Sequence, residues 1–375
     1  MGLKVCLFSS AYPERDKTLS RIGIDVTQSI DGFVMATNRN EMVPFLGIYQ
    51  RMVDYYFSFK KLDKLDFLFI TGGGTIMPRT VANKTLVYVH YITDYPIHSQ
   101  VASQEDSLRS RLKRIYMKPW QFISNNLDIS YKLDYIKKAT IITNSNYTKN
   151  VIKTAWGIDA KVIYPPCPQY SFPLGIQEER CNVVCSMGRF TPEKNYEMII
   201  KLAQCLPNVR FELMGSVANN DIHYLEKLTN AAPENTTFHV NATIQEKMNV
   251  LKQSKVLVHS FIDEPFGIAL IEAMSAGLIP VTHNSGAAKV DGIVPEKFRY
   301  RDLDSAIAAI TNALSSWNPQ EALSLREFAK GFSPDSFREN LKNFISNWIK
   351  SMANNHIAIE AKINTLKGET IRAIE

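Results

Sequence analysis

The sequence of 375 residues has no long hydrophobic run. No stretch approaches the roughly 18 to 20 consecutive apolar residues that a membrane-spanning helix needs. The short apolar run that ends at Pro13 is too brief for a signal peptide and has no small-residue cleavage site, so it predicts a first buried strand. We therefore expect a cytoplasmic protein, with peripheral attachment to the cytoplasmic face of a membrane as a further hypothesis.

Cysteine is scarce, and neither sign of charge dominates. An odd number of cysteines without two pairs at zinc-ligand spacing argues against a disulfide framework or a zinc site, so we expect buried free thiols in a reducing compartment. The 43 basic residues exceed the 37 acidic ones only slightly, which gives a net charge of +6. This balance is compatible with a nucleotide, a membrane or a nucleic acid as partner. The five cysteines are Cys6, Cys167, Cys181, Cys185 and Cys205.

Short apolar runs alternate with longer amphipathic segments along the whole chain. This pattern is typical of parallel strands joined by helices. With 45% apolar and 21% charged residues, the chain has the composition of a globular protein, and its length favours two domains. The predicted strands are 4–9, 66–71, 85–90, 140–144, 182–187, 210–214, 255–259 and 278–282.

A proline-rich segment separates the two halves. Four prolines lie between Tyr164 and Pro173, and such a segment cannot continue a helix or a central strand. We predict an α/β protein with two Rossmann-like domains that face each other across a cleft, in which ligands collect at the carboxyl ends of the strands. The predicted divisions are a first Rossmann-like domain at 1–165, a linker at 166–176, a second Rossmann-like domain at 177–335 and a helical segment at 336–375.

The second half carries the pattern with the most chemical content, from Asp263 to Gly277. Two carboxylates, Glu264 before a predicted helix and Glu272 within it, flank the Pro-Phe-Gly segment that ends at Gly267. Glycine permits close approach of the backbone, and a helix start offers free N–H groups and a partial positive charge. Two isolated glutamates would indicate only a solvated surface. Because these two flank a Pro-Phe-Gly segment and a helix start, they predict a site for a diphosphate or for sugar hydroxyls.

A second pattern runs from Gly188 to Asn195. Arg189 and Lys194 follow a predicted strand on one short loop, and Pro192 suits the first turn of the next helix. Cations are disfavoured at a helix start by the dipole, so their presence favours a diphosphate clamp over a solvated surface. Such a clamp would stabilise charge on a departing phosphate.

These two patterns resemble the family 4 retaining glycosyltransferases, which have the GT-B fold. Glu264 and Glu272 fit the E-x7-E motif of that family, and the segment from Gly188 to Lys194 fits its phosphate-binding G-R-x-x-x-E-K motif. The segments 191–195, 266–268 and 283–289 resemble more narrowly the members that add α-1,2-linked mannose from GDP-mannose to dolichol-linked glycans. The resemblance implies a C-terminal helix that crosses back to the N-terminal domain.

The resemblance also implies roles for individual residues. Arg189 and Lys194 would bind the donor diphosphate, and Glu272 the ribose. The residues implied at the donor sugar are Glu264, Phe266, Gly267 and Ile268, and those implied beside the base are Asn241 and Ala242. Asn284, Ser285 and Gly286 follow the next strand and are expected near the same pocket.

The first half contributes fewer residues. His90 ends a predicted strand, where a structural role is the ordinary interpretation, but the resemblance implies that it faces the donor sugar. Members of the family place a Gly-Gly loop after the first strand, near the donor phosphates. This chain has Ser9 to Pro13 at that place, and Gly23 is the candidate for the same role.

Segment 109–122 carries five cations and three aromatic residues, which predicts contact with an anionic membrane. A solvated helix is the alternative, and no recognised module favours nucleic acid.

The predicted reaction is metal-independent transfer of a sugar, without a cofactor, from a nucleotide diphosphate to a glycan or lipid-linked acceptor with retention at the anomeric carbon. The pair Asp302 and Asp304 lies away from the motifs, so it predicts a helix start. The expectation that the sugar is mannose and the donor GDP-mannose rests on the resemblance alone. The alternatives are a UDP-sugar-dependent glucosyltransferase, a sugar-nucleotide epimerase of the same fold, and a non-catalytic membrane-associated protein that binds sugar nucleotides.

Overall fold

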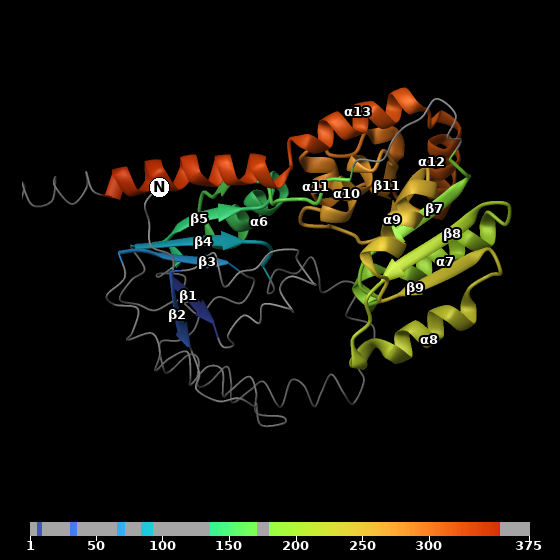
Figure 1. Cartoon of the computed structure of the whole chain (residues 1–375), viewed down its shortest axis with the longest axis horizontal. Coiled ribbons are helices and arrows are strands. Elements are labelled where there is room, and N and C mark those ends of the chain that lie inside the picture. The colour runs from blue at the N-terminus through green and yellow to red at the C-terminus, as the bar shows by residue number, and fades with distance from the viewer. Residues whose placement is uncertain are drawn as a thin grey trace, which may run out of the picture. The chain divides into compact units, whose positions relative to one another are not determined.

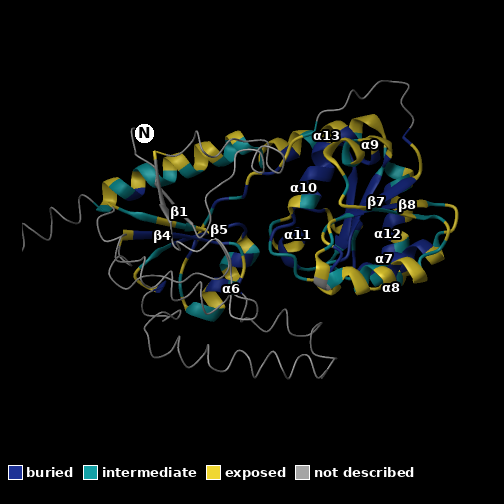
Figure 2. Cartoon of the chain, turned by 60° about the horizontal axis from the view of Figure 1, so that its bottom comes forward, coloured by how far each residue is buried: buried dark blue, intermediate teal, exposed yellow. Residues whose placement is uncertain are grey.

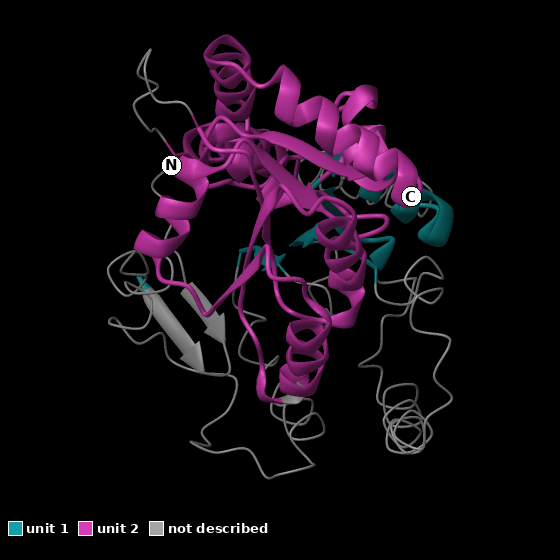
Figure 3. Ribbon diagram, turned by 90° about the vertical axis from the view of Figure 1, so that its right-hand side faces the viewer, with its two compact units in different colours: residues 1–144, 148–162 teal, residues 145–147, 163–375 magenta. Residues whose placement is uncertain are grey.

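The computed structural model describes residues 6–9, 31–35, 66–71, 84–92, 136–170 and 180–352. The chain divides into two compact units (Figure 3). Unit 1 comprises residues 1–144 and 148–162, and unit 2 comprises residues 145–147 and 163–375. Each unit is an α/β structure with a parallel sheet, as the alternating sequence pattern predicts.

Unit 1 contains a parallel sheet in the order β3-β4-β5-β6 (Figure 1). Its central strand β4 (Thr85–Val89) is buried at every residue, because a parallel strand is covered on both faces and so reads as a continuous apolar run. The remaining elements are β1 (Cys6–Ser9), which pairs in parallel with β2 (Gly32–Met35), and β3 (Leu68–Thr71), β5 (Thr140–Thr143), α6 (Asn146–Trp156) and β6 (Lys161–Val162). The first two residues of α6 belong to unit 2.

Unit 2 contains a parallel sheet of six strands in the order β12-β11-β10-β7-β8-β9. Its central strands β7 and β10 are wholly buried. The strands are β7 (Val183–Met187), β8 (Arg210–Gly215), β9 (Thr236–Val240), β10 (Val256–His259), β11 (Ile279–His283) and β12 (Arg299–Tyr300). The eight strands expected from the sequence are therefore confirmed across the two units, with ends that differ by one or two residues.

Helices cover both faces of the unit 2 sheet. Figure 2 shows α9, α10 and α13 over one face and α7, α8 and α12 over the other, with the buried strands between them. Before the terminal helix, the α-helices in the described part of unit 2 are α7 (Tyr196–Cys205), α8 (Ile222–Ala231), α9 (Ile244–Gln253), α10 (Ile268–Ser275), α11 (Gly286–Val290), α12 (Leu303–Ser316) and α13 (Pro319–Lys330). The same part contains the short 3-10 turns η5 (Pro192–Lys194), η6 (Asn219–Asp221) and η7 (Glu296–Phe298).

The strand order of unit 2 reverses between β7 and β10. From β7 the chain proceeds through β8 to β9 at one edge, and from β10 it proceeds through β11 to β12 at the other. At such a switch point the loops after the two central strands diverge and leave a crevice for ligands at the carboxyl edge of the sheet. The two motifs of the second half follow these two strands, so the fold brings them together.

Residues 163–170 form neither helix nor strand, and residues 334–352 form the expected terminal helix. Of the cysteines, Cys167 and Cys185 are buried and free as expected, but Cys181 and Cys205 are free and exposed, so the expectation of burial was wrong for them. Cys205 ends α7 and Cys181 precedes β7, where the chain reaches the surface.

Some predictions concern parts of the chain outside the described residues. These are the loop 10–13, Gly23, the basic segment 109–122 and the linker residues 171–176. Within the described ranges, no helix is both long and apolar enough to cross a bilayer.

Candidate active site

The loop after β7 presents Lys194 at the carboxyl edge of the unit 2 sheet. The loop begins at Gly188, and the 3-10 turn η5 starts with Pro192, as the sequence predicts for a first turn. The Ser260 hydroxyl donates a hydrogen bond of 2.6 Å to the Lys194 carbonyl. The backbone of Lys194 is therefore fixed to the loop that follows β10.

The loop after β10 presents Glu264 at the same edge. Asp263 adopts a φ of 60°, and its N–H donates to Ser285 Oγ at 2.8 Å. The Glu264 carbonyl accepts a bond of 3.0 Å from the Ala287 N–H. Gly286 permits this contact, because a Cβ there would lie 2.5 Å from the Glu264 carbonyl oxygen. The loop is thus bound to the start of α11 on both sides of Glu264.

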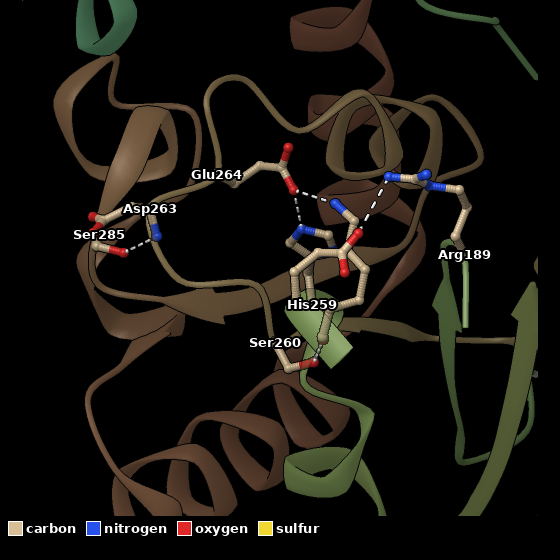
Figure 4. Close-up of polar contacts among 8 residues, drawn as sticks. Arg189, His259, Ser260, Asp263, Glu264 and Ser285 are labelled. Carbon is tan, nitrogen blue, oxygen red and sulfur yellow. Dashed lines mark hydrogen bonds and ion pairs between the residues drawn. The ribbon is translucent and has the colours of Figure 1, made fainter. Parts of the chain in front are cut away.

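Glu264 Oε2 accepts two bonds from different elements. Lys194 Nζ and His259 Nε2 each lie 2.8 Å from that oxygen, while the other carboxylate oxygen points away from both (Figure 4). Burial alone would raise the pKa of Glu264, but the bonds and charges of His259 and Lys194 outweigh it and lower the pKa from 4.5 to about 2. The carboxylate therefore stays ionised at neutral pH and has one oxygen free for a ligand hydroxyl.

Helix α10 begins directly after this loop. Gly267 is its N-cap with a φ of 93°, a conformation that favours glycine, and Phe266 before it is buried. Ile268 is 44% exposed, and no side chain caps this helix start. The first N–H groups of α10 are consequently available to hydroxyl or phosphate oxygens.

Glu272 lies in the second turn of α10 and is buried, with an exposed fraction of 8%. It forms an ion pair of 2.5 Å with Lys247 of α9, and the Lys247 ammonium lies 5.4 Å from the centre of the Tyr170 ring. Burial by itself would lower the pKa of Lys247, but the Glu272 charge outweighs it and raises the pKa. Each glutamate of the motif is thus paired with a cation from another element.

Asn241 and Ala242 follow the end of β9. Asn241 adopts a φ of 55°, and its N–H donates to the Gly215 carbonyl at 2.7 Å. Thr243 then starts α9 with a reciprocal capping box that includes Glu246. This loop and the start of α9 therefore have a defined backbone beside the end of β8.

Arg189 is not part of the Glu264 cluster. Its guanidinium is exposed and lies 3.3 Å from Glu193, four residues further along the same loop. An exposed pair of this kind contributes little to stability, so Arg189 can be redirected to an anionic ligand at little cost.

His90 lies in unit 1, at the end of β4. Its ring Nε2 lies 3.0 Å from the Thr71 hydroxyl, and its carbonyl accepts a bond of 2.9 Å from the Asn144 side chain. Burial lowers the pKa of His90. The side chain is therefore neutral at physiological pH, and it could hydrogen-bond a ligand without adding charge.

Two residues of this site were missed from the sequence. His259 is the last residue of a buried strand, and its only signal is a polar side chain five positions before Glu264. Lys247 lies in the first turns of an ordinary amphipathic helix, and its spacing from Glu272 carries no pattern. Both residues act on the predicted glutamates through tertiary contacts.

Across the described ranges there is no cluster of three or more His, Cys, Asp or Glu side chains that could hold a metal ion. Asp302 forms the N-cap of α12, with a side chain that accepts a bond from the Ser305 N–H. The expected helix start at Asp302 and Asp304 is confirmed.

Comparison with known proteins identifies the fold. Residues 169–323 match the family described as "Glycosyl transferases group 1". The structure resembles Anabaena Alr3699/HepE, which was solved in complex with UDP and glucose; the TM-score is 0.57 at 17% identity, over 91% of each chain. The chain has the GT-B fold. The fold class predicted from the sequence is confirmed.

Relatives of known activity share part of the sequence. The human "GDP-Man:Man(3)GlcNAc(2)-PP-Dol alpha-1,2-mannosyltransferase" is 29% identical over 209 residues, which is 50% of this chain and 41% of the human protein. The Xenopus laevis protein of the same description is 29% identical over 294 residues, 68% of this chain and 59% of that protein. The chain thus spans less than two thirds of the length of either relative. The resemblance drawn from the two motifs is confirmed.

Proposed function

We propose that this GT-B protein is a retaining glycosyltransferase that transfers mannose from GDP-mannose in α linkage to a lipid-linked saccharide. The observation that carries the proposal is the contact between Lys194 and Glu264 at the switch point of the unit 2 sheet. In this contact a cation, which suits a diphosphate, lies beside an ionised carboxylate, which suits sugar hydroxyls, and this supports the proposal. The relatives named above act on GDP-mannose and a dolichol-linked glycan, which supports this donor and this class of acceptor.

Within this proposal, the residues have separate tasks. Lys194 and Arg189 bind the donor diphosphate. Glu264, with the backbone of Phe266, Gly267 and Ile268, binds hydroxyls of the sugar. Glu272 binds the ribose, Asn241 and Ala242 flank the base, and His90 of unit 1 contributes to the donor sugar. The proposed domain limits remain 1–165, 177–335 and 336–375, with the linker at 166–176.

The proposed reaction proceeds on one face of the sugar. An acceptor hydroxyl oxygen bonds to the anomeric carbon while the bond from that carbon to the diphosphate breaks, and its electron pair goes to the leaving phosphate oxygen. The proton of the hydroxyl passes to a donor phosphate oxygen. Lys194 and Arg189 stabilise the charge on the leaving group without a metal ion. Entry and departure on the same face retain the anomeric configuration.

Three alternatives make different products. A glucosyltransferase would use UDP-glucose, which is consistent with the UDP and glucose bound by the Anabaena protein. An epimerase would convert the donor without an acceptor, and a binding protein would convert nothing. Both glutamates and both cations are present here, so catalysis is favoured over binding alone.

Labelled donors with and without a lipid extract test the proposal. GDP-mannose is expected to label lipid in a product with α linkage, and Lys194→Ala or Glu264→Ala is expected to reduce transfer by about a hundredfold or more. Lys227→Ala is the matched control, because Lys227 is exposed on α8 and its removal should leave transfer unchanged. Near-wild-type turnover by both site variants, or labelling from UDP-glucose alone, would contradict the proposal.

A further inference from the structure

We infer that His259 is a positioning residue that holds Glu264 in its sugar-binding orientation when Lys194 turns to the donor diphosphate. The inference rests on the proposed function and adds a residue to it. It follows from the fact that Glu264 Oε2 accepts hydrogen bonds from both Lys194 and His259, whose side chains differ in flexibility. The more flexible side chain is the one that can exchange this bond for a bond to the donor diphosphate.

His259 is held firmly on the sheet. It is the last residue of β10, a strand with neighbours on both sides, and its side chain is only 5% exposed. Its carbonyl accepts a bond of 3.2 Å from the buried Tyr300 hydroxyl on β12. An imidazole has two rotatable bonds and is enclosed by the core, so its Nε2 stays near one position.

Lys194 is the more adjustable of the two donors. Its ammonium ends a flexible chain of four carbons and is 19% exposed, and it lies 4.2 Å from the centre of the Phe261 ring. A lysine ammonium has three donors and can follow an anion over a short distance. A diphosphate carries more negative charge than a carboxylate, so Lys194 is expected to move at least part of its bonding to the donor.

When Lys194 bonds to the diphosphate, Glu264 needs another hydrogen-bond donor. A buried carboxylate without a hydrogen bond is unfavourable, and it would move toward solvent or bind a proton. The bond of 2.8 Å from His259 Nε2 supplies that partner on the side of Oε2. Because His259 occupies Oε2, the other oxygen stays directed away from the two protein donors (Figure 4). That oxygen can then accept a bond from a hydroxyl of the donor sugar.

Two substitutions separate the hydrogen bond from the bulk of the ring. In His259→Gln the side-chain amide reaches about as far as Nε2, whereas in His259→Asn it ends near the position of Nδ1. The Asn variant is expected to lower kcat with GDP-mannose about tenfold to a hundredfold, the loss of a bond to a charged group. Its affinity for GDP without the sugar should change less than threefold, and the Gln variant should recover most of kcat.

A control variant removes a hydrogen bond to a different carboxylate of unit 2. Tyr224→Phe deletes the bond to Glu197, between α8 and α7, and should leave kcat unchanged. His259→Leu provides a second variant if the Asn variant fails to fold, because an apolar side chain suits the buried strand, and the same fall in kcat is expected.

The outcomes distinguish this inference from the proposed function. Wild-type kcat in the Asn or Leu variant overturns the inference alone. Equal losses in the Gln and Asn variants, or loss of GDP binding together with kcat, indicate a general structural role and also overturn it. A wild-type protein that neither binds GDP-mannose nor transfers mannose overturns the proposed function and this inference with it.

Discussion

At the scale of single residues, the Glu264 loop depends on the missing side chain of Gly286. A Cβ at this position would lie 2.5 Å from the Glu264 carbonyl oxygen and 2.7 Å from its nitrogen. Both are backbone atoms, so the loop itself would have to move. The φ of 60° at Gly286 adds strain to any other residue.

Gly286→Ala is therefore expected to weaken binding of GDP-mannose at least tenfold by displacing Glu264. Gly292→Ala separates the two causes, because Gly292 has a similar φ of 65° but nothing within 4 Å of its Cβ position. Both variants should lose some stability, of the order of 1 kcal/mol from the backbone conformation. Calorimetric titration of each variant measures the binding, and equal affinities in the two variants would contradict the prediction.

Residue types could be predicted from the sequence, but their contacts could not. Glu264 and Lys194 were identified because a carboxylate and a cation each followed a strand beside glycine. Their ion pair joins positions 70 residues apart, and no local pattern encodes such a contact. His259 and Lys247 each have an ordinary structural explanation in the sequence, so only the fold reveals what they bind.

At the scale of elements, the start of α6 is held by a side chain from far along the chain. The N–H groups of Asn146 and Tyr147 donate to the two oxygens of Asp291, at 2.7 and 3.1 Å. The Tyr164 hydroxyl donates to the same carboxylate at 3.0 Å. Burial and the Asp291 charge together raise the pKa of Tyr164 to about 12. Asp291 thus accepts hydrogen bonds from the N–H groups in the first turn of α6.

Asp291→Ala is expected to lower the free energy of unfolding by about 1 to 2 kcal/mol, since it removes a carboxylate that accepts bonds from the first turn of α6 and from the Tyr164 hydroxyl. The pKa of Tyr164 should fall part of the way to its ordinary value of 10, because burial still raises it. Denaturant unfolding and ultraviolet titration measure the two effects. In the control Asp159→Ala, which alters an exposed ion pair with Lys153, neither quantity should change. No change in Asp291→Ala would refute this role.

Strands that are long enough to show an apolar pattern could be predicted from the sequence, but the shortest strands could not. The buried runs that became β4, β7 and β10 are long enough to show an apolar pattern. In contrast, β6 and β12 have two residues each, and they form only because a longer neighbour supplies the other half of the hydrogen bonds. Their existence depends on the sheet rather than on their own sequence.

At the scale of the whole molecule, the proposed transfer to a lipid-linked acceptor requires that the protein reach a membrane surface. The segment 109–122 lies outside the described residues, so its role remains a prediction from sequence. It carries no acidic residue beside its cations, which are Arg109, Arg111, Lys113, Arg114 and Lys118. The crossing of the C-terminal helix to the N-terminal domain likewise stays a prediction.

Replacement of Arg111, Lys113 and Arg114 by alanine is expected to weaken binding to vesicles with anionic lipid by about a hundredfold, since each cation near such a surface contributes roughly 1 kcal/mol. The control removes the same charge from exposed lysines of unit 2, at positions 201, 227 and 330. Co-sedimentation with vesicles measures both variants. A similar fall in both would show that net charge, rather than this segment, governs binding.

The strand order of unit 2 also bears on how the protein acquires activity. Because β7 pairs with β10 as well as with β8, the centre of the sheet joins two stretches of chain that are synthesised far apart. Contacts of such high sequence separation form late in folding, since a long loop must close first. A nascent chain that has emerged only as far as β9 would have Lys194 but no Glu264. A nucleotide sugar that binds both Lys194 and Glu264 would stabilise the completed sheet and protect it from proteolysis. Addition of the nucleotide sugar should therefore increase the yield of refolded protein.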